Sequence, residues 1–271
     1  VAEKYKGMKN FFRKVAFGVG PNEDVPSDPL KWALGQLKDV PDLAWKGKIY
    51  SEKELRKHYR DWVYGDRKVL RKKYKDNKTL YKTHKDILRH KTGQKFWESL
   101  EISIRHNEGI NSSSPVLAKL WMFWGNFFAI SEKDFLANYS TGAYQREIIR
   151  PNLNQTFEKM VYDVTTSWAM IHHLDNSESA GPKSVTASQD WRRKKKRPAT
   201  INENHARELL ELHTVSPKAG YIQEDVITIS DLQEKEFNGE ELSFEEETAL
   251  NKFRKIRVKK LAKKVKKTVQ R

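Results

Sequence analysis

Two histidines and several charged residues lie within one short segment, INENHARELLELHTVSPKAGYIQED, and together they could bind a ligand. His205 and His213 carry imidazoles, which are common metal ligands and titrate near neutral pH. Glu208 and Glu211 place carboxylates within five residues of His213. The spacing does not match the HExxH motif of zinc proteases. The segment therefore indicates a polar site for a metal, an anion or a substrate, without naming a reaction.

The same segment has a simpler interpretation as an amphipathic helix, which Thr200 and Glu203 begin as a capping box. At 3.6 residues per turn, one arc is apolar and contains both histidines: His205, Ala206, Leu209, Leu210, Leu212 and His213. The opposite arc is polar and contains Glu203, Asn204, Arg207, Glu208 and Glu211. In this interpretation the histidines lie at the edge of the core. The i,i+4 pairs of Arg207 are then solvated, and each adds roughly 0.2–0.5 kcal/mol.

Other helices must position such a site, and the longest is predicted from Ser51 to Leu88. Ser51 and Glu54 have the spacing of a second capping box, S-x-x-E. The apolar face that follows has the spacing i, i+4, i+7 and i+8 and consists of Leu55, Tyr59, Trp62 and Val63. This face predicts that the start of the helix packs on a core.

Three further helices follow along the chain. A buried, aromatic helix is predicted over residues 116–130, with Pro115 at its first position. The next helix should end near Arg150, because Pro151 disfavours helical backbone in the residue before it. A third helix is predicted over residues 157–176, where apolar residues recur at helical spacing.

The predicted fold class is all-α, because no stretch alternates apolar and polar residues as a half-buried strand would. We expect an irregular multi-helix domain over residues 1–230. A long basic loop over residues 177–200 interrupts it, since this stretch is rich in Ser, Gly, Pro and charge and has no periodicity. Residues 231–271 are predicted to form an acidic stretch and a charged, helical C-terminal tail.

Composition limits the function classes further. The 271 residues contain no Cys, which excludes disulfides, zinc sites built on cysteine and a cysteine nucleophile. No G-x-S-x-G, G-x-G-x-x-G or phosphate-binding P-loop occurs, so a serine hydrolase and a nucleotide-binding site have no support. No segment has the features of a signal peptide or a membrane-spanning helix, so the cytoplasm is the default expectation. No cofactor is identified.

Five segments, in order, resemble a large bacterial family known as the domain of unknown function eighteen-hundred. Their sequences are FFRKVAFGVGP, LWMFWGNFFAIS, YQREIIRPN, SWAMIHHLDNSES and NENHARELLELHTVSPKAGYIQEDV, which together extend from about residue 10 to residue 226. The resemblance implies a largely helical protein. It also implies that members are often exported, and that the partner is a protein resembling the alkaline-phosphatase superfamily. It implies no activity.

Polar residues that match the motifs of this family are the candidate ligand-binding residues: Arg146, Glu147, Arg150, Asp175, Asn176, Asn202, Glu203, Asn204, Arg207, Glu208, Glu211 and His213. Tyr144 matches as well. These residues could converge around one metal, phosphate or other anion. They could equally form a buried hydrogen-bond network between helices, because buried polar groups need partners.

The chain departs from the family pattern in two places. Members usually carry a His-Asn-His-Phe string where this chain has Gly125-Asn126-Phe127-Phe128. A metal or proton-transfer site that depended on those histidines would be missing here. Members also usually continue into another long helical part, whereas this resemblance stops near Val226. We therefore expect a truncated or degenerate member.

Positive charge is concentrated and suggests a second function, the binding of polyanions. The net charge is +16, and residues 46–95 carry eighteen Lys or Arg against six acids. The remaining candidate contacts lie in the loop and the tail: Arg192, Arg193, Lys194, Lys195, Lys196, Arg197, Lys259, Lys260, Lys263 and Lys264. The tail has one apolar stripe on a cationic helix, so its partner could be nucleic acid or an anionic membrane surface. A merely solvated basic surface is the alternative.

Overall fold

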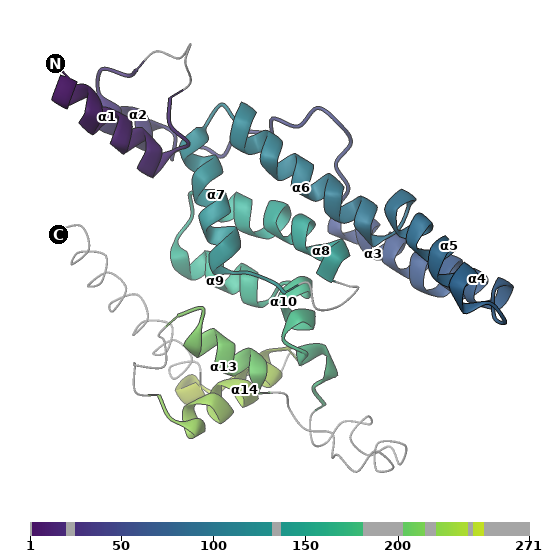
Figure 1. Cartoon of the computed structure of the whole chain (residues 1–271). Helices are drawn as coiled ribbons and strands as arrows, with labels where there is room; N and C mark the ends of the chain where they lie inside the picture. Colours follow the sequence, from purple (N-terminus) through teal and green to yellow (C-terminus); the bar gives the residue numbers. More distant parts are fainter. Residues whose placement is uncertain are drawn as a thin grey trace. The chain divides into compact units, whose positions relative to one another are not determined.

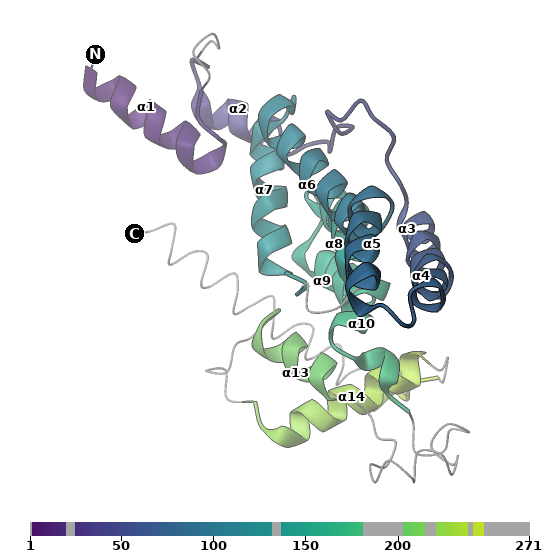
Figure 2. The same cartoon turned by 45° about the vertical axis from the view of Figure 1, so that its right-hand side comes forward.

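The computed structural model describes residues 2–19, 25–131, 137–180, 203–214, 221–237 and 241–246. Within these ranges all regular structure is helical and no strand occurs, which confirms the all-α fold class (Figures 1 and 2). The chain divides into two compact units, Val1–Asp163 and Val164–Arg271.

Residues 181–200 of the predicted basic loop lie outside the described residues. The predicted basic tail, after residue 246, lies outside them as well. The predicted division of the chain near residue 230 stays a prediction.

The first unit contains the helices α1 (Ala2–Val15), α2 (Pro29–Gly35), α3 (Glu52–Arg60), η1 (Asp61–Asp66), α4 (Arg67–Lys73), α5 (Lys78–Lys91), α6 (Gln94–Asn111), α7 (Pro115–Phe127), α8 (Ala137–Tyr144), η2 (Gln145–Ile149) and η3 (Arg150–Asn152). It is followed by α9 (Phe157–Thr165). Of these, η1 and η2 are π-helical and η3 is a 3₁₀ turn.

Helix α3 begins as its sequence predicts. The Ser51 side chain accepts a hydrogen bond from the backbone N–H of Glu54, and Glu54 Oε2 accepts one from the backbone N–H of Ser51 at 2.8 Å. The predicted apolar face is buried: Leu55 and Trp62 pack with Trp97 and Tyr139, and Tyr59 and Val63 lie at the margin of this cluster. The capping box and the apolar face are thus confirmed.

The predicted long helix from residue 51 to residue 88 is wrong, because the chain reverses after α4. A turn at residues 74–77 separates α4 from α5, and the Asn77 side chain caps α5 by accepting a hydrogen bond from Leu80 N–H at 2.9 Å. The two helices form a hairpin, drawn side by side in both views (Figures 1 and 2). Asn is a strong N-cap, and this signal outweighs the helical propensity of the flanking lysines.

Helix α7 is the predicted aromatic helix, with Pro115 at its start as predicted and Phe127 at its end instead of Ile130. It is buried on one face only, because Phe123 and Phe127 are 55% and 40% exposed. Trp121 is 2% exposed, and its Nε1 donates to the carbonyl oxygen of Gln145 at 2.7 Å. This bond ties α7 to the π-helical segment η2, where the backbone departs from the regular helical hydrogen-bond pattern.

The helix predicted to end near Arg150 continues for another turn. Helix α8 passes into η2 and then into the 3₁₀ turn η3, which contains Pro151. Pro151 lies in the first turn of η3, where its missing N–H breaks no intrahelical hydrogen bond. The change of helix type therefore accommodates the proline that was expected to end the helix.

The second unit contains α10 (Trp168–His173), η4 (Asn176–Glu178), α13 (Asn204–Glu211) and α14 (Gln223–Phe237). The helix predicted over residues 157–176 is divided at Thr166 and Ser167, and the Ser167 side chain caps α10. Ala206 and Leu210 of α13 pack against Val226 and Ile229 of α14. No helix in the described part of the chain is both long and apolar enough to cross a bilayer.

Candidate functional site

Arg146 lies in η2 and forms a buried ion pair with Glu101 of α6. Its Nε and Nη2 donate to the two carboxylate oxygens of Glu101 at 2.8 Å and 2.7 Å. Nη2 also donates to the carbonyl oxygen of Tyr50 at 2.6 Å. The two side chains are 5% and 9% exposed. The guanidinium is thus engaged on two sides inside the first unit.

Arg150 makes a second buried ion pair, one helical turn further along. Its Nη2 donates to Glu108 at 3.1 Å and to the carbonyl oxygen of Pro41 at 2.5 Å. Glu108 is 2% exposed and also accepts hydrogen bonds from Ala44 N–H and from the Ser112 hydroxyl. These contacts of the Glu108 carboxylate are all made inside the fold.

Glu147 belongs to the same arrangement, since its Oε1 accepts a hydrogen bond from the backbone N–H of Glu52 at 3.0 Å. The candidate residues Arg146, Glu147 and Arg150, with their partner Glu108, therefore hold the segment of residues 41–52 against α6 and η2. The contacts of Arg146 and Arg150 are those of a buried hydrogen-bond network, whereas Glu147 is exposed at its edge.

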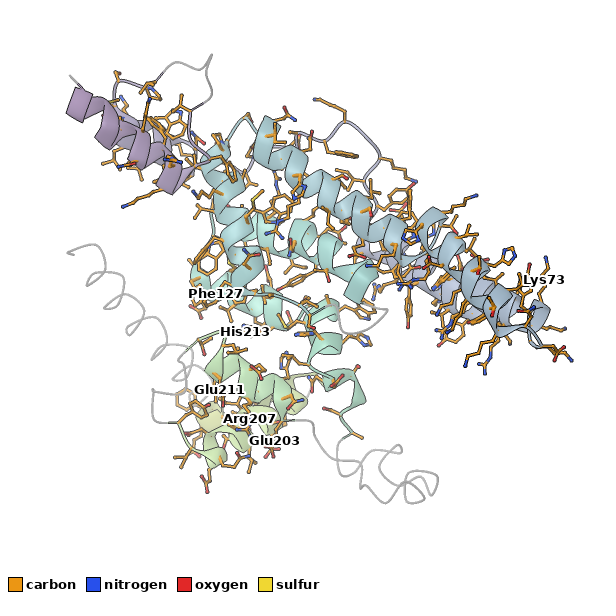
Figure 3. All side chains as sticks on the ribbon, viewed as in Figure 1. Lys73, Phe127, Glu203, Arg207, Glu211 and His213 are labelled. Carbon is orange, nitrogen blue, oxygen red and sulfur yellow. The ribbon has the colours of Figure 1, made fainter. Side chains whose placement is uncertain are left out.

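In the second unit, Arg207 lies at the centre of a polar cluster on α13 and α14. Its Nη2 donates to Glu203 at 3.3 Å and to Gln223 at 2.9 Å, and Gln223 donates in turn to Glu203 at 2.6 Å. Nη1 lies 3.9 Å from Glu211, whose carboxylate also accepts the hydroxyl proton of Tyr221. Figure 3 labels Glu203, Arg207 and Glu211 along α13. Both i,i+4 pairs predicted from the sequence are confirmed.

Both histidines are buried, as the apolar arc predicted. His205 is 6% exposed, and its Nε2 lies 2.8 Å from the carbonyl oxygen of Thr165, to which it donates. His213 is 4% exposed, and its backbone N–H donates to the carbonyl oxygen of Glu208. Leu212 was assigned to the same arc, but it is 61% exposed. That assignment is wrong because Leu212, which still has helical backbone and bonds to the carbonyl oxygen of Glu208, lies at the edge of the arc beside Glu208.

The remaining candidates have varied surroundings. Asp175 has left-handed backbone (φ 57°), which Asp tolerates better than most residues. Asn176 Oδ1 accepts the hydroxyl proton of Ser179 at 2.8 Å, and Asn204 is exposed. Asn202 and Thr200 lie outside the described residues, but the predicted position of the capping box is wrong, because α13 begins at Asn204 and Glu203 is its N-cap residue.

The candidate residues therefore divide between the two units. Arg146, Glu147 and Arg150 belong to the first unit, and the nine others belong to the second. Convergence of all of them on one ligand stays a prediction. Among the residues that the structure describes, no three His, Asp or Glu side chains are grouped closely enough to hold a metal ion.

The pKa of Glu208 is raised above its ordinary 4.5 by burial and by the negative charge of Glu211, while Arg207 opposes the shift. Because the folded chain then binds this proton more tightly, its contribution to stability is present below pH 4.5 and is lost as the pH rises through the raised pKa. Thermal unfolding followed by circular dichroism measures this effect. As the pH rises from 4.5 to neutrality, the Tm of Glu208→Gln should fall less than the Tm of the wild type.

Glu54→Gln is the control with the opposite sign. Hydrogen bonds from the backbone and side chain of Ser51 lower the pKa of Glu54, so its contribution is present above pH 4.5 and is lost as the pH falls. Equal pH dependence of Tm in Glu208→Gln and the wild type would contradict the raised pKa.

Sequence reasoning missed the acidic partners Glu101 and Glu108. A signal was present, because the two carboxylates are seven residues apart and thus share one face of a helix, just as Arg146 and Arg150 share one face four residues apart. Matching spacings of opposite charge predict two facing ion pairs. Which helices face each other is a tertiary fact that these spacings do not contain.

The segment Gly125–Phe128, where the resemblance implies histidines, makes structural contacts. Gly125 lies so close to Gln145 that an added Cβ would be 3.2 Å from the amide carbon. Asn126 accepts a hydrogen bond from Arg105, which also donates to Gln145 at 2.9 Å. Phe128 is fully buried. The substituted motif thus packs α7 against its neighbours.

A different site emerges on the hairpin of α4 and α5. Between Arg67 and Lys91 the chain carries eleven Lys or Arg residues and only two acids, Asp76 and Asp86. Most of these basic residues are exposed, and Figure 3 labels Lys73 near the tip of the hairpin. A shallow depression of about 260 Å³ on α5 is lined by Lys82, Lys85, Asp86 and Arg89. We call this surface, from Arg67 to Lys91, the basic hairpin.

Comparison with known proteins identifies the family but no individual relative. No curated protein and no solved structure matches the chain. The family model described as "Protein of unknown function (DUF1800)" matches residues 11–232. Since this match includes the buried ion pairs, the α13 cluster and most of the described residues, the chain belongs to the DUF1800 family.

Proposed function

We propose that this protein is a non-enzymatic binding protein whose basic hairpin contacts the phosphate backbone of a nucleic acid. The observation that supports this most is a row of four basic residues on one face of α5: Lys78, Lys82, Lys85 and Arg89. At 3.6 residues per turn they share an arc of about 60°. A continuous row of cations is what a chain of phosphates requires.

The dimensions of this row suit a nucleic acid. Eleven residues of α-helix rise about 16 Å. Each strand of a duplex places a phosphate about every 3.4 Å along its axis, so the row extends over roughly five phosphates of one strand. The depression beside Lys82 and Arg89 offers one of these phosphates a recessed position.

Little negative charge on the hairpin competes with such a ligand. Asp76 lies 3.8 Å from Lys75, and Asp86 lies 3.7 Å from Arg89, and both carboxylates are more than half exposed. By contrast, Arg146, Arg150 and Arg207 already contact carboxylates inside their own units. The hairpin is therefore the better candidate for an external anion.

Aromatic contacts give the hairpin a fixed geometry. The rings of Tyr74 and His84 stack in parallel, with centroids 4.7 Å apart, and so join the end of α4 to α5. Lys73 lies over the Tyr74 ring at 5.3 Å. Tyr64 on η1 is 72% exposed and offers an aromatic face on which an unpaired base could stack. A stiff cationic surface with an exposed ring suits single-stranded nucleic acid.

The test compares two double variants of the full chain in fluorescence anisotropy. The probes are a labelled single-stranded RNA and a labelled duplex DNA, titrated over a series of salt concentrations. Lys78→Gln with Lys82→Gln removes two charges from the row. Lys31→Gln with Lys38→Gln removes two equally exposed charges elsewhere in the first unit.

Each lost phosphate contact should lower the slope of log K against log salt by about 0.7 for single strands or 0.9 for duplex. We expect the hairpin variant to lose about 1.4 to 1.8 from this slope and the control variant to lose almost nothing. Equal slopes in the two variants would contradict the proposal. A second result would also contradict the proposal. In it, the wild type binds anionic phospholipid vesicles but not the nucleic acids, and the hairpin variant binds the vesicles more weakly.

The other functional expectations stay predictions. Phosphate contacts by the loop residues 192–197 and the tail residues 259–264 would add to those of the hairpin. A metal or small-anion site around His213 predicts bound metal or phosphate in elemental analysis of the purified protein. A partner resembling the alkaline-phosphatase superfamily is implied only by the family resemblance.

A further inference from the structure

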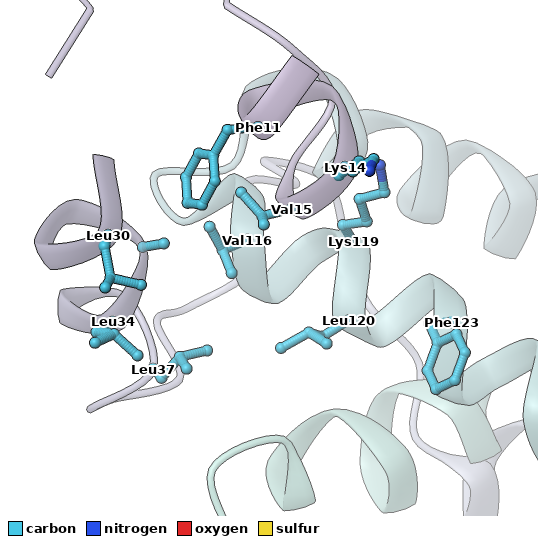
Figure 4. A pocket seen from close by; sticks show the side chains of 11 residues that line it. Phe11, Lys14, Val15, Leu30, Leu34, Leu37, Val116, Lys119, Leu120 and Phe123 are labelled. Atoms are coloured by element: carbon cyan, nitrogen blue, oxygen red, sulfur yellow. The ribbon is translucent and has the colours of Figure 1, made fainter. Parts of the chain in front are cut away.

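An open apolar groove lies between α1, α2 and α7 of the first unit (Figure 4). Its volume is about 440 Å³, and its lining is apolar except for Lys14 and Lys119. Leu30, Leu34 and Phe123 line it, although they are 60%, 55% and 55% exposed. Apolar side chains gathered in this way on a surface usually mark a binding site.

The floor of the groove is already packed. Ala16, Ala33 and Val116 are buried there against one another, with Phe11 and Leu120 half-buried beside them. Lys119 fixes the floor from one side, because its Nζ donates to the carbonyl oxygens of Arg13 and Ala16 at the end of α1. The groove therefore exists before any ligand binds, which lowers the cost of binding.

The spacing of the lining residues identifies the shape of the occupant. On α1 the apolar lining residues Phe11 and Val15 have the spacing i,i+4. The spacing is i,i+4,i+7 for Leu30, Leu34 and Leu37, on α2 and just after it. It is the same for Val116, Leu120 and Phe123 on α7. Helices pack by fitting such ridges into one another's grooves. Three ridges around an open groove fit a fourth helix that carries apolar anchors at the same spacing.

Charge identifies the chemistry of the occupant. Lys9, Arg13 and Lys14 are exposed on α1, and residues 8–19 contain no acid. On α7, Lys119 lines the groove, and this helix also has no acid. A cationic amphipathic helix, such as the predicted tail of this chain, would be repelled. An acidic helix would pair with Lys14 at the rim while its apolar face filled the groove.

We infer that this groove is a docking site for an acidic amphipathic helix of another protein. The inference is independent of the basic hairpin, because it rests on different residues and a different kind of partner. Burial of Leu30, Leu34 and Phe123 supplies the affinity, and Lys14 sets the orientation and excludes basic helices.

The experiment uses the full chain and a labelled synthetic helical peptide. The peptide has about 18 residues, or five turns, with Leu at i, i+3, i+4 and i+7 and Glu along both flanks. A peptide of the same composition with the leucines distributed around the helix is the comparison. Leu34→Ser with Phe123→Ser removes two exposed anchors, and Lys14→Glu reverses a rim charge. Val69→Ser with Ile87→Ser is the control, because these residues are 65% and 48% exposed on the hairpin.

We expect the amphipathic peptide to bind the wild type at least about tenfold more tightly than the rearranged peptide. The anchor variant should lose about tenfold in affinity for the peptide, and Lys14→Glu should lose several-fold. The control variant should bind the peptide as the wild type does. The anchor variant should bind nucleic acid as the wild type does. Unchanged thermal unfolding of each variant would show that folding is intact.

Three results would overturn the inference. The two peptides could bind equally, which would mean that only the charge of the peptide matters. The anchor and control variants could lose the same affinity. Finally, binding to anionic phospholipid vesicles could depend on Leu34 and Phe123 while binding to the peptide does not depend on them. That result would assign the groove to a membrane surface.

Discussion

Replacement of Arg146 by Ala is expected to lower the free energy of unfolding by about 3–5 kcal/mol. The change leaves Glu101, which is 9% exposed, as a buried carboxylate without the two hydrogen bonds from the guanidinium. It also removes the donor to the carbonyl oxygen of Tyr50. Urea unfolding followed by tryptophan fluorescence measures this loss, which is a large share of the roughly 5–15 kcal/mol of a typical domain.

Two further variants separate the buried charge from other causes. Arg146→Met with Glu101→Leu removes both charges, so it should recover most of the stability lost in Arg146→Ala. Lys48→Ala removes the partner of Glu54, where the two side chains are 65% and 47% exposed and the atoms lie 3.8 Å apart, and it should cost about 1 kcal/mol or less. If Arg146→Ala cost no more than Lys48→Ala, the buried ion pair would have no structural role.

The second large effect is expected at Trp121 in the core of the first unit. Trp121→Ala should cost about 3–5 kcal/mol, because this side chain is 2% exposed and its removal leaves a cavity. The Arg150 guanidinium lies 6.0 Å from the centre of its ring, so the second ion pair also loses a neighbour. Urea unfolding again provides the measurement.

Trp121→Phe is the matched variant, since it keeps an aromatic ring but loses the hydrogen bond from Nε1 to Gln145. We expect it to cost about 1 kcal/mol from that bond, with a further cost for the smaller ring. Phe123→Ala changes an aromatic residue that is 55% exposed on the same helix, and it should change stability by about 0.5 kcal/mol or less. Equal losses for Trp121→Ala and Phe123→Ala would mean that α7 is not packed as described.

Local features of this fold could be predicted from the sequence. The capping box of Ser51 and Glu54 needs only residues three apart, and the pairs of Arg207 need only residues four apart. The apolar face that begins at Leu55 also depends on helical periodicity alone. Such contacts form within one helix, so the sequence contains all the information that they require.

Features that depend on the competition between signals could not be predicted as well. The chain reverses at residues 74–77 because Asn77 caps a new helix, although the surrounding basic residues favour one long helix. Leu212 is exposed although it keeps helical backbone, because it lies at the edge of the apolar arc beside Glu208. A periodic pattern gives the face of a helix but not the residue at which the helix ends.

The candidate site shows the same limit over longer distances. Arg146 and Glu101 are 45 residues apart in sequence, and Arg150 and Glu108 are 42 apart, so only the tertiary fold brings each pair together. The sequence offered a ligand site and a buried network as alternatives for Arg146, Glu147 and Arg150. Their contacts in the first unit are those of the network, whereas convergence with His213 stays a prediction.

The most direct test of the proposed function is to identify which residues touch nucleic acid. The full chain is irradiated with a thiouridine-substituted single-stranded RNA, and the cross-linked peptides are identified by mass spectrometry. The proposal predicts cross-links concentrated between Tyr64 and Lys91, including peptides that contain Tyr64, Lys78 or Lys82. Cross-links confined to other parts of the chain, or none above those of an uncharged polymer control, would contradict it.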